Sequence, residues 1–383
     1  MLSLLLIRNK TKKIKKEVGS LQRVYNFSAG PAVLPAEVVR TVQEELPSYR
    51  RSGMSIMEIS HRSSLFTDLQ ETAETDLRKL MQIPDNYDVL FLQGGGTLQF
   101  AMTAMNLAVK TKRVGFIDSG HWAQRAMEET ALVKGTKAVV IASSKNQKYT
   151  QLPKIEPITG QFDYLHLTVN NTIEGTMYHQ IPAELKKFPL VGDLSSIILG
   201  YNYQVTDFDL IYAGAQKNIG PAGLTVVILK HELLQNAPEL PAMLSYPKQV
   251  QKHSALNTPP VFAIYVAGLV FKWLLAQGGV AAMQEKNEQK AQLLYAEIEN
   301  SKLFKSPVAV EDRSLTNIPF VTGSAQLNQL FVAEAQAVGL LNLKGHRSVG
   351  GMRASLYNAM PLAGVKRLVE FMQEFERQHG GRN

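Results

Sequence analysis

The sequence predicts an α/β protein: a large domain with a mainly parallel sheet covered by helices on both faces, followed by a smaller α+β C-terminal domain. Short apolar runs of strand length alternate with helical or turn segments over most of the chain, and this order is typical of parallel sheets. The chain of 383 residues is longer than one ordinary domain. A glycine pair, Gly278-Gly279, separates a long apolar helical stretch from a charged one. We therefore expect a large domain over residues 24–277 and a small domain over residues 278–383.

The large domain is expected to contain runs of buried strands rich in Val, Ile, Leu, Phe and Tyr. These strand candidates are residues 89–93, 114–118, 138–141, 164–169, 190–193, 210–213 and 225–229. Apolar residues at three- and four-residue spacing predict helices, and these are expected over residues 37–46, 66–80, 98–107 and 261–277. Ligands of open α/β sheets bind beyond the carboxyl ends of the strands. The residues that closely follow these strands are therefore expected to meet in one crevice, and they are Gly94–Thr97, His121-Trp122, Thr172, Asp193 and Lys217.

A charged helix over residues 280–300 is expected to lead into the rest of the small domain. Strands over 318–321 and 352–356 alternate there with helices over 330–338 and 364–378. This order of elements predicts an α+β layer.

The formal charge of +8 is concentrated at the N-terminus. Residues 1–23 contain seven basic residues and one acidic residue, a net of +6, so the remaining 360 residues carry only +2. No basic face for a nucleic acid is implied. The leader has its apolar residues before its charges, the reverse of a secretory signal, and is too short to span a bilayer. We expect a disordered leader and no membrane partner, with weak contact to a membrane surface as a minor alternative.

The chain contains no cysteine. This excludes disulfides, thiolate metal sites and a catalytic thiol, and we expect no metal ion in the site. The absence fits a reducing compartment, and the cytoplasm is the expected location.

One lysine has an unusual setting. Lys217 lies in a glycine-rich turn after the apolar run 210–213, and no other charged residue occurs between Asp209 and Lys230. A partly desolvated lysine has a lowered pKa and a nucleophilic amine, as a Schiff base with an aldehyde cofactor requires. From the turn alone, a solvated loop lysine is an equally good interpretation.

A glycine turn follows the strand candidate 89–93. The order of strand, Gly94-Gly95-Gly96-Thr97 and helix presents backbone N–H groups to a phosphate. A dinucleotide site of an oxidoreductase is disfavoured, because the Gly-x-Gly-x-x-Gly spacing is missing. Asp118 lies near the distance at which such a site places an acidic residue, so that alternative stays open.

Several blocks together resemble the phosphoserine aminotransferases, pyridoxal-phosphate enzymes of the aspartate-aminotransferase fold within the class-V aminotransferases. The blocks are FSAGPA at 27–32, MEISHR at 57–62, YAGAQKNIGPAG at 212–223, NTPP at 257–260 and KGHRSVGGMRAS at 344–355. The resemblance extends from about residue 25 to the end of the chain. Several long blocks in the right order are far more specific than one glycine turn.

The resemblance implies a set of residues that bind pyridoxal 5'-phosphate. Lys217 would form the Schiff base and shuttle the α-proton, and Asp193 would keep the ring nitrogen charged. The remaining contacts would come from Gly95, Gly96, Thr97, Trp122, Thr172, Gln216, Asn257 and Thr258. Trp122 would stack on the ring, Thr172 and Gln216 would contact cofactor oxygens, and the three residues of the glycine turn would hold the phosphate.

Each of these positions also has an ordinary structural interpretation. Asp193 would equally cap a helix ahead of Ser195-Ser196. Trp122 would be a core tryptophan, and Thr172 and Gln216 would shape turns.

The sequence differs from the family pattern at two positions, and the resemblance also implies a homodimer. Thr97 stands where other members carry an arginine, so backbone amides would take more of the phosphate charge. Ala29 stands where some relatives have a serine. Asn257 and Thr258 match residues that reach the phosphate from the neighbouring subunit, which implies a homodimer.

The substrates implied by the resemblance are anionic. Arg353 would bind the α-carboxylate, while His61, Arg62, His346 and Arg347 would bind the distal anion, since arginine holds carboxylates and phosphates through two parallel hydrogen bonds. Each could instead be a solvated surface residue.

The implied reaction transfers the amino group of L-glutamate to 3-phosphohydroxypyruvate, giving O-phospho-L-serine and 2-oxoglutarate in serine biosynthesis. Alternatives are another class-V aminotransferase, such as a serine–glyoxylate type, and a non-catalytic binding module of the same fold. A desulfurase is disfavoured, because no cysteine is available to carry sulfur. The sequence leaves open the start codon and any role in pyridoxine biosynthesis.

Overall fold

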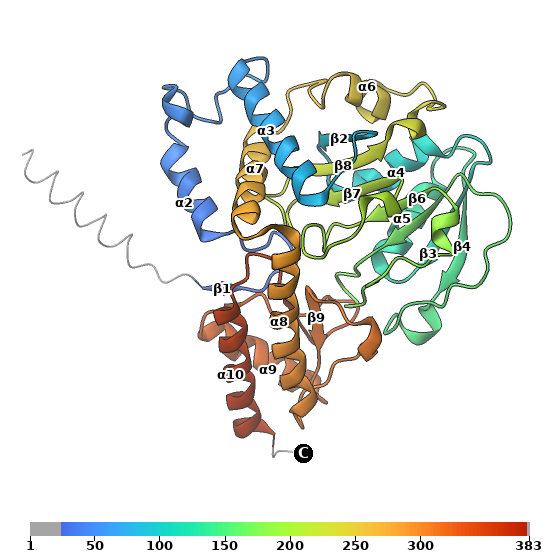
Figure 1. The fold of residues 1–383 in the computed structure, drawn as a ribbon. Coiled ribbons are helices and arrows are strands. Elements are labelled where there is room, and N and C mark those ends of the chain that lie inside the picture. Colours follow the sequence, from blue (N-terminus) through green and yellow to red (C-terminus); the bar gives the residue numbers. More distant parts are fainter. Residues whose placement is uncertain (1–23, 381–383) are drawn as a thin grey trace, which may run out of the picture.

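The computed structural model describes residues 24–380 (Figure 1). The expected leader over residues 1–23 lies outside the described residues. A central sheet with its helices forms the larger part of the molecule, and the C-terminal helices and two small sheets form a second part below it in the view.

Within residues 24–380, seven strands form the central sheet in the order β2-β8-β7-β6-β5-β3-β4. The strands are β2 (Tyr87–Leu92), β3 (Arg113–Asp118), β4 (Lys137–Ser143), β5 (Tyr164–Thr168), β6 (Leu190–Asp193), β7 (Leu210–Gly214) and β8 (Thr225–Lys230). Each lies within two residues of a predicted strand. Neighbouring strands are parallel except where β8 pairs, because β8 is antiparallel to both β2 and β7. The prediction of a mainly parallel sheet is therefore confirmed.

The antiparallel direction of β8 was not predicted, and it follows from the short connection before the strand. A parallel neighbour needs a crossover of a dozen or more residues, usually with a helix. Only residues 215–224 separate β7 from β8, so the chain reverses and returns beside β7. Lys217 lies in this reversal.

Side chains of the sheet alternate between two hydrophobic cores, as a sheet covered on both faces requires. On β7, Ile211 packs into one core and Tyr212 into the other. The first core includes apolar residues of α3 (Ser64–Met81) and α7 (Val261–Ala276), and the second includes those of α4 (Gly95–Leu107) and α5 (His121–Ala131). The prediction of helices on both faces is confirmed.

The C-terminal part combines three helices with small sheets. The helices are α8 (Gly279–Asn300), α9 (Ala325–Ala337) and α10 (Leu362–His379). Strands β9 (Asn317–Phe320) and β11 (Met352–Ser355) pair antiparallel, while β10 (Leu340–Leu341) pairs parallel with β1 (Tyr25–Asn26). The first described segment is thus joined to the C-terminal part, which the sequence did not predict.

Shorter elements complete the fold. They are α2 (Ala36–Glu45), α6 (Tyr246–Gln251) and the 3-10 turns Tyr49–Arg51, Lys145–Gln147, Leu185–Lys187, Val205–Asp207, His231–Leu234, Ala242–Leu244 and Val310–Asp312. Within residues 24–380 no single helix has the length and hydropathy to cross a membrane, although the pair α7 and α8, bent by 82°, passes that test together.

The aromatic cluster of the C-terminal part supplies a stability prediction. Phe331 is fully buried on α9 and its ring lies 5.1–5.7 Å from those of Phe304, Phe320, Phe371 and Phe375. We expect Phe331→Ala to lower the free energy of unfolding by about 3–5 kcal/mol, because it removes apolar contacts and leaves a cavity.

Chemical denaturation measures this loss. The matched control is Leu330→Ala on the same helix, because Leu330 is 38% exposed and its truncation is expected to cost less than about 1 kcal/mol. Equal losses in the two variants would show that the aromatic cluster contributes little.

Candidate active site

Lys217 lies in the reversal between β7 and β8 at the carboxyl end of β7. Its Nζ donates a hydrogen bond to Thr172 Oγ1 at 2.8 Å and lies 5.6 Å from the ring centroid of Trp122. Part of the side chain reaches the surface, but protein surrounds the amine, and this burial lowers the pKa of Lys217 to about 8. The charge of Asp193 opposes that change and the charge of Arg353 adds to it. The setting differs from that of a solvated loop lysine.

Thr172 connects the lysine to the C-terminal part of the chain. Its hydroxyl accepts from Lys217, and its carbonyl oxygen accepts from Arg353 Nη1 at 3.2 Å. Thr172 is buried in the loop after β5, while Arg353 lies on β11. One residue therefore holds the amine and the guanidinium in the same place, although the sequence separates them by more than a hundred residues.

Asp193 ends β6, and its carboxylate makes a local hydrogen bond and also acts on nearby titratable groups. Its Oδ1 accepts from the backbone N–H of Ser195 at 2.9 Å, which is the local turn interpretation. Its charge also acts on Lys217, on Tyr212 and on His166. Asp193 is 7% exposed, so its carboxylate keeps this electrostatic influence in a region of little water.

His166 lies behind Asp193 on β5. Its Nε2 is 2.7 Å from the hydroxyl of Tyr212. Burial lowers the pKa of His166 to about 4, against the opposing effect of Asp193, so this imidazole is neutral at pH 7.

The glycine turn brings the start of α4 to the same place. Gly94 has φ +93°, a conformation that suits glycine, and α4 begins at Gly95. A Cβ on Gly96 would lie 3.4 Å from Ser195 Oγ and 3.7 Å from the ring of Tyr212, while a Cβ on Gly95 would meet no atom within 4 Å. The first turn of α4 therefore faces the Asp193 loop on one side and open space on the other, with Thr97 exposed in the same turn.

These groups fit a cofactor that has an aldehyde, an aromatic ring and a phosphate. Lys217 supplies an amine of lowered pKa, Trp122 an aromatic face and Asp193 a buried carboxylate. The free N–H groups of the first turn of α4, together with the helix dipole, attract an anion. Trp122 Nε1 and His166 Nδ1 are buried without a hydrogen-bond partner in the described part of the chain. Buried polar atoms are usually paired, and a bound molecule is one way to pair them.

Cationic groups gather beside the lysine at the junction of the two parts. The ring of His346 lies 5.7 Å from the ring of His121, which begins α5. Burial lowers the pKa of His346, and the charges of His121, Arg353 and Arg347 lower it further. Three groups that carry or accept positive charge therefore act on His346, and an anion bound beside them would stabilise the positive charges.

Five predicted residues have no direct bond to the lysine or to its hydrogen-bonded partners within the described chain. Arg62, Arg347, Asn257 and Thr258 are exposed, and His61 is partly exposed. Among residues 24–380, no hydrogen bond or ion pair joins the side chains of these five residues to Lys217, Thr172 or Arg353.

Two of the predicted positions do have informative backbone contacts. The carbonyl oxygen of Thr258 accepts from Gln93 Nε2 at 3.2 Å, so the segment 257–258 lies next to the glycine turn. The carbonyl oxygen of Gln216 accepts from Ala32 N at 2.9 Å. The FSAGPA block is thereby held beside the lysine turn.

The sequence analysis expected His121 in the crevice but missed four other residues that the structure places around the lysine. They are His166, Glu174, Ser195 and Tyr212. Each lies on a predicted strand or soon after one, and that position is the signal that could have found them. Glu174 is the most distinctive, because its Oε1 accepts from the backbone N–H of His121 at 2.9 Å while its Oε2 is buried without a partner in the described chain. Burial raises the pKa of Glu174.

Comparisons with known proteins agree on one family. Residues 24–368 match the family described as Aminotransferase class-V. Phosphoserine aminotransferase from Lactiplantibacillus plantarum is 58% identical over 357 residues, covering 93% of this chain and 99% of the relative. The structure of phosphoserine aminotransferase from Bacillus circulans subsp. alkalophilus superimposes with a TM-score of 0.91 at 43% identity, covering 94% of this chain and 99% of that one.

A second solved phosphoserine aminotransferase, studied for radiation damage of its Schiff base, has a TM-score of 0.90 at 40% identity and covers 94% of this chain and all of its own. Solved aminotransferases of other specificities are similar at 17–18% identity, which shows the shared fold alone.

Proposed function

The chain belongs to the class-V aminotransferase family, and from that premise we propose that it is a phosphoserine aminotransferase whose reaction centre is Lys217. It transfers the amino group of L-glutamate to 3-phosphohydroxypyruvate and produces O-phospho-L-serine and 2-oxoglutarate. The observation that carries the assignment of Lys217 is the hydrogen-bonded chain Lys217–Thr172–Arg353, because it places a nucleophilic amine next to an anchor for a carboxylate.

The cofactor of the family is pyridoxal 5'-phosphate, which supplies an electron sink for the carbanion formed at the substrate's α-carbon. We propose that Lys217 holds its aldehyde carbon and Asp193 its ring nitrogen. Trp122 covers the ring, and the N–H groups of Gly95, Gly96 and Thr97 bind the phosphate. Gln216 and Thr172 shape the rest of the site.

Lys217 acts first as a nucleophile and later as a carrier of a proton. At pH 7 an amine with a pKa of about 8 is unprotonated in roughly one molecule in ten, against about one in three thousand for an ordinary lysine near 10.5. The low pKa therefore increases the reactive form by roughly 300-fold. With the cofactor in place, the Lys217 amine would carry the α-proton of the substrate, and Thr172 Oγ1 would hold the amine in position.

The substrates bind through their anions. Arg353 has one guanidinium nitrogen bonded to the carbonyl oxygen of Thr172, and its remaining donors are proposed to hold the α-carboxylate that both substrates share. The distal anion, a phosphate or the second carboxylate of glutamate, is proposed to bind His346 and Arg347. The anion would then add a negative charge beside the cationic groups around His346.

The exposed residues suggest that a second chain completes the site. We propose a homodimer in which Asn257 and Thr258 reach the phosphate of the partner's cofactor and His61 and Arg62 assist at the distal anion. The support is that, within residues 24–380, no hydrogen bond or ion pair joins these side chains to Lys217, Thr172 or Arg353. Size-exclusion chromatography with light scattering would test the assembly, and an active monomer would contradict it.

A steady-state assay with glutamate and 3-phosphohydroxypyruvate tests the reaction. We expect phosphohydroxypyruvate to be preferred over hydroxypyruvate, which has the same α-carboxylate and lacks the phosphate. Equal kcat/KM values for the two keto acids would contradict the assignment of the distal anion site.

The arginine of the distal site gives a sharper prediction. We expect Arg347→Ala to raise KM for phosphohydroxypyruvate by about 10- to 100-fold, the loss of one charge-assisted hydrogen bond of about 1.5–3 kcal/mol. KM for hydroxypyruvate is expected to change less than threefold, because that keto acid has no group to contact Arg347. An equal rise for both keto acids would show that Arg347 acts on the fold and not on the phosphate.

A further inference from the structure

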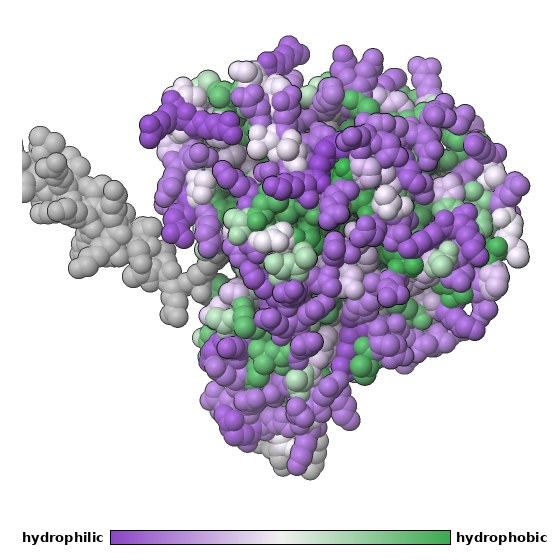
Figure 2. Space-filling model, viewed as in Figure 1, coloured by the Kyte–Doolittle hydropathy of each residue, from purple (hydrophilic) through white to green (hydrophobic). Residues whose placement is uncertain are grey.

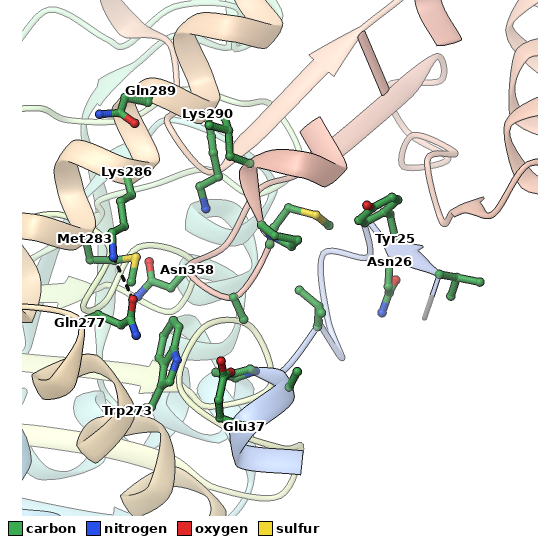
Figure 3. A pocket seen from close by; sticks show the side chains of 18 residues that line it. Tyr25, Asn26, Glu37, Trp273, Gln277, Met283, Lys286, Gln289, Lys290 and Asn358 are labelled. Atoms are coloured by element: carbon green, nitrogen blue, oxygen red, sulfur yellow. Dashed lines mark hydrogen bonds between the residues drawn. The ribbon is translucent and has the colours of Figure 1, made fainter. Parts of the chain in front are cut away.

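We propose that a cavity at the junction of the two parts, separate from the Lys217 site, binds a small aromatic carboxylate. The cavity has a volume of about 640 Å³ and is formed by the segment 24–37, the end of α7, the first half of α8 and the segment 358–362 before α10 (Figure 3). Protein pockets for small molecules usually measure about 300–1,000 Å³, so the space suits a ligand of that size. None of its lining residues belongs to the predicted cofactor or substrate site.

The walls of the cavity offer an apolar and partly aromatic surface. Trp273 on α7, Met283 on α8 and Met360 line it, and Figure 3 shows Trp273 and Lys290 extending from different helices toward the same space. In the space-filling view, hydrophobic residues gather over α7 and over α10 on either side of the start of β1 (Figure 2). An aromatic ring would pack against Trp273 and the flexible methionines.

A buried positive charge lies under this surface. Lys290 is 2% exposed, and its Nζ donates to the carbonyl oxygens of Leu356 at 3.0 Å and Tyr357 at 2.9 Å. An ammonium has three donors, and no carboxylate is bonded to this one within residues 24–380. Burial lowers the pKa of Lys290 to about 7, and the other charge that acts on it is the positive one of Lys286. Among the described residues the Lys290 amine therefore has carbonyl partners and no carboxylate partner, and an anion bound beside it would favour its charged form.

Lys286 adds a second positive charge on the same wall. It lies one turn before Lys290 on α8, and its Nζ donates to Gln277 Oε1 at 2.9 Å. Like charges four residues apart weaken a helix by a few tenths of a kcal/mol, so helix stability does not account for the pair. A carboxylate at this end of the cavity would neutralise both lysines. The acidic residue among the lining residues, Glu37, comes from the opposite segment, at the start of α2.

The fluorescence of Trp273, which lines the cavity, can report ligand binding there. The chain has two tryptophans, Trp122 and Trp273. In the Trp122→Phe variant, the fluorescence comes from Trp273, so a ligand bound at the Lys217 site no longer changes the signal by contact with an indole. Titration of this variant with 3-phenylpropionate is expected to give a saturable change in fluorescence. The uncharged 3-phenylpropionamide, of nearly the same shape, is expected to bind at least tenfold more weakly.

Charge-removing variants in the same background locate the anion. Lys290→Met and Lys286→Gln are each expected to raise Kd for 3-phenylpropionate about tenfold. Lys272→Gln, on the exposed side of α7 next to Trp273, is the matched control and is expected to leave Kd unchanged. Circular dichroism shows whether each variant folds. If Lys290→Met does not fold, the Kd of Lys286→Gln for 3-phenylpropionate and the comparison with 3-phenylpropionamide test the proposal. The proposal fails if no saturable change occurs, if acid and amide bind alike, or if the folded lysine variants bind like the control.

Discussion

Lys217→Ala is expected to lower kcat by at least about 10⁴-fold, because it removes both the group that bonds to the cofactor and the group that moves the α-proton. Loss of a covalent nucleophile in other enzymes costs as much or more. The visible absorbance of the protein loaded with pyridoxal phosphate is expected to shift to that of the free cofactor. Steady-state kinetics and an absorption spectrum measure both effects.

Two controls separate this loss from misfolding. Burial disfavours the charged form of Lys217, so the cofactor-free variant is expected to unfold at the same temperature as the parent protein or a higher one. Added methylamine is expected to restore a small part of the activity, since a free amine can take over the proton transfer. An unchanged spectrum in Lys217→Ala would show that another lysine holds the cofactor.

Arg353→Lys is expected to lower kcat/KM about 10²-fold for glutamate and for phosphohydroxypyruvate alike. Both substrates have an α-carboxylate, and lysine presents a single charged group where arginine presents a planar fork. The loss corresponds to the charge-assisted hydrogen bonds of one carboxylate, about 1.5–3 kcal/mol. Half-reaction kinetics with each substrate alone measure it.

The matched control is Arg367→Lys. Arg367 lies on α10 with a loose contact of 3.8 Å to Glu370, and its replacement is expected to leave both half-reactions within twofold of the parent values. If Arg353→Lys affected glutamate only, Arg353 would bind the distal carboxylate and the roles of the cations would have to be exchanged.

The sequence predicted the sheet and its covering helices well because those features depend on local patterns. Apolar runs of strand length and three- to four-residue spacing are visible in short windows. The direction of β8 was missed although the ten residues between β7 and β8 leave little room for a crossover. The pairing of β1 with β10 joins residues more than three hundred positions apart, and no local pattern encodes such a contact.

The sequence could identify residues of the site but not the contacts between them. The apolar run 210–213 and the glycine turn after the strand candidate 89–93 placed Lys217 and Gly96 near strand ends. The hydrogen bond that Arg353 donates to the carbonyl oxygen of Thr172 depends on how the C-terminal part docks against the sheet. The approach of His121 to His346 depends on the same docking, which is why neither pair could be predicted from spacing along the chain.

The pH dependence of cofactor capture by Lys217 tests the account most directly. Cofactor-free protein is mixed with pyridoxal phosphate at pH values from 6 to 11, the product is reduced with borohydride, and peptide mapping locates the label. A lysine with a pKa of about 8 gains its reactive form as the pH rises through that value, so labelling is expected at Lys217 with a half-maximal rate near pH 8. Labelling spread over surface lysines, or a half-maximum near pH 10.5, would contradict it.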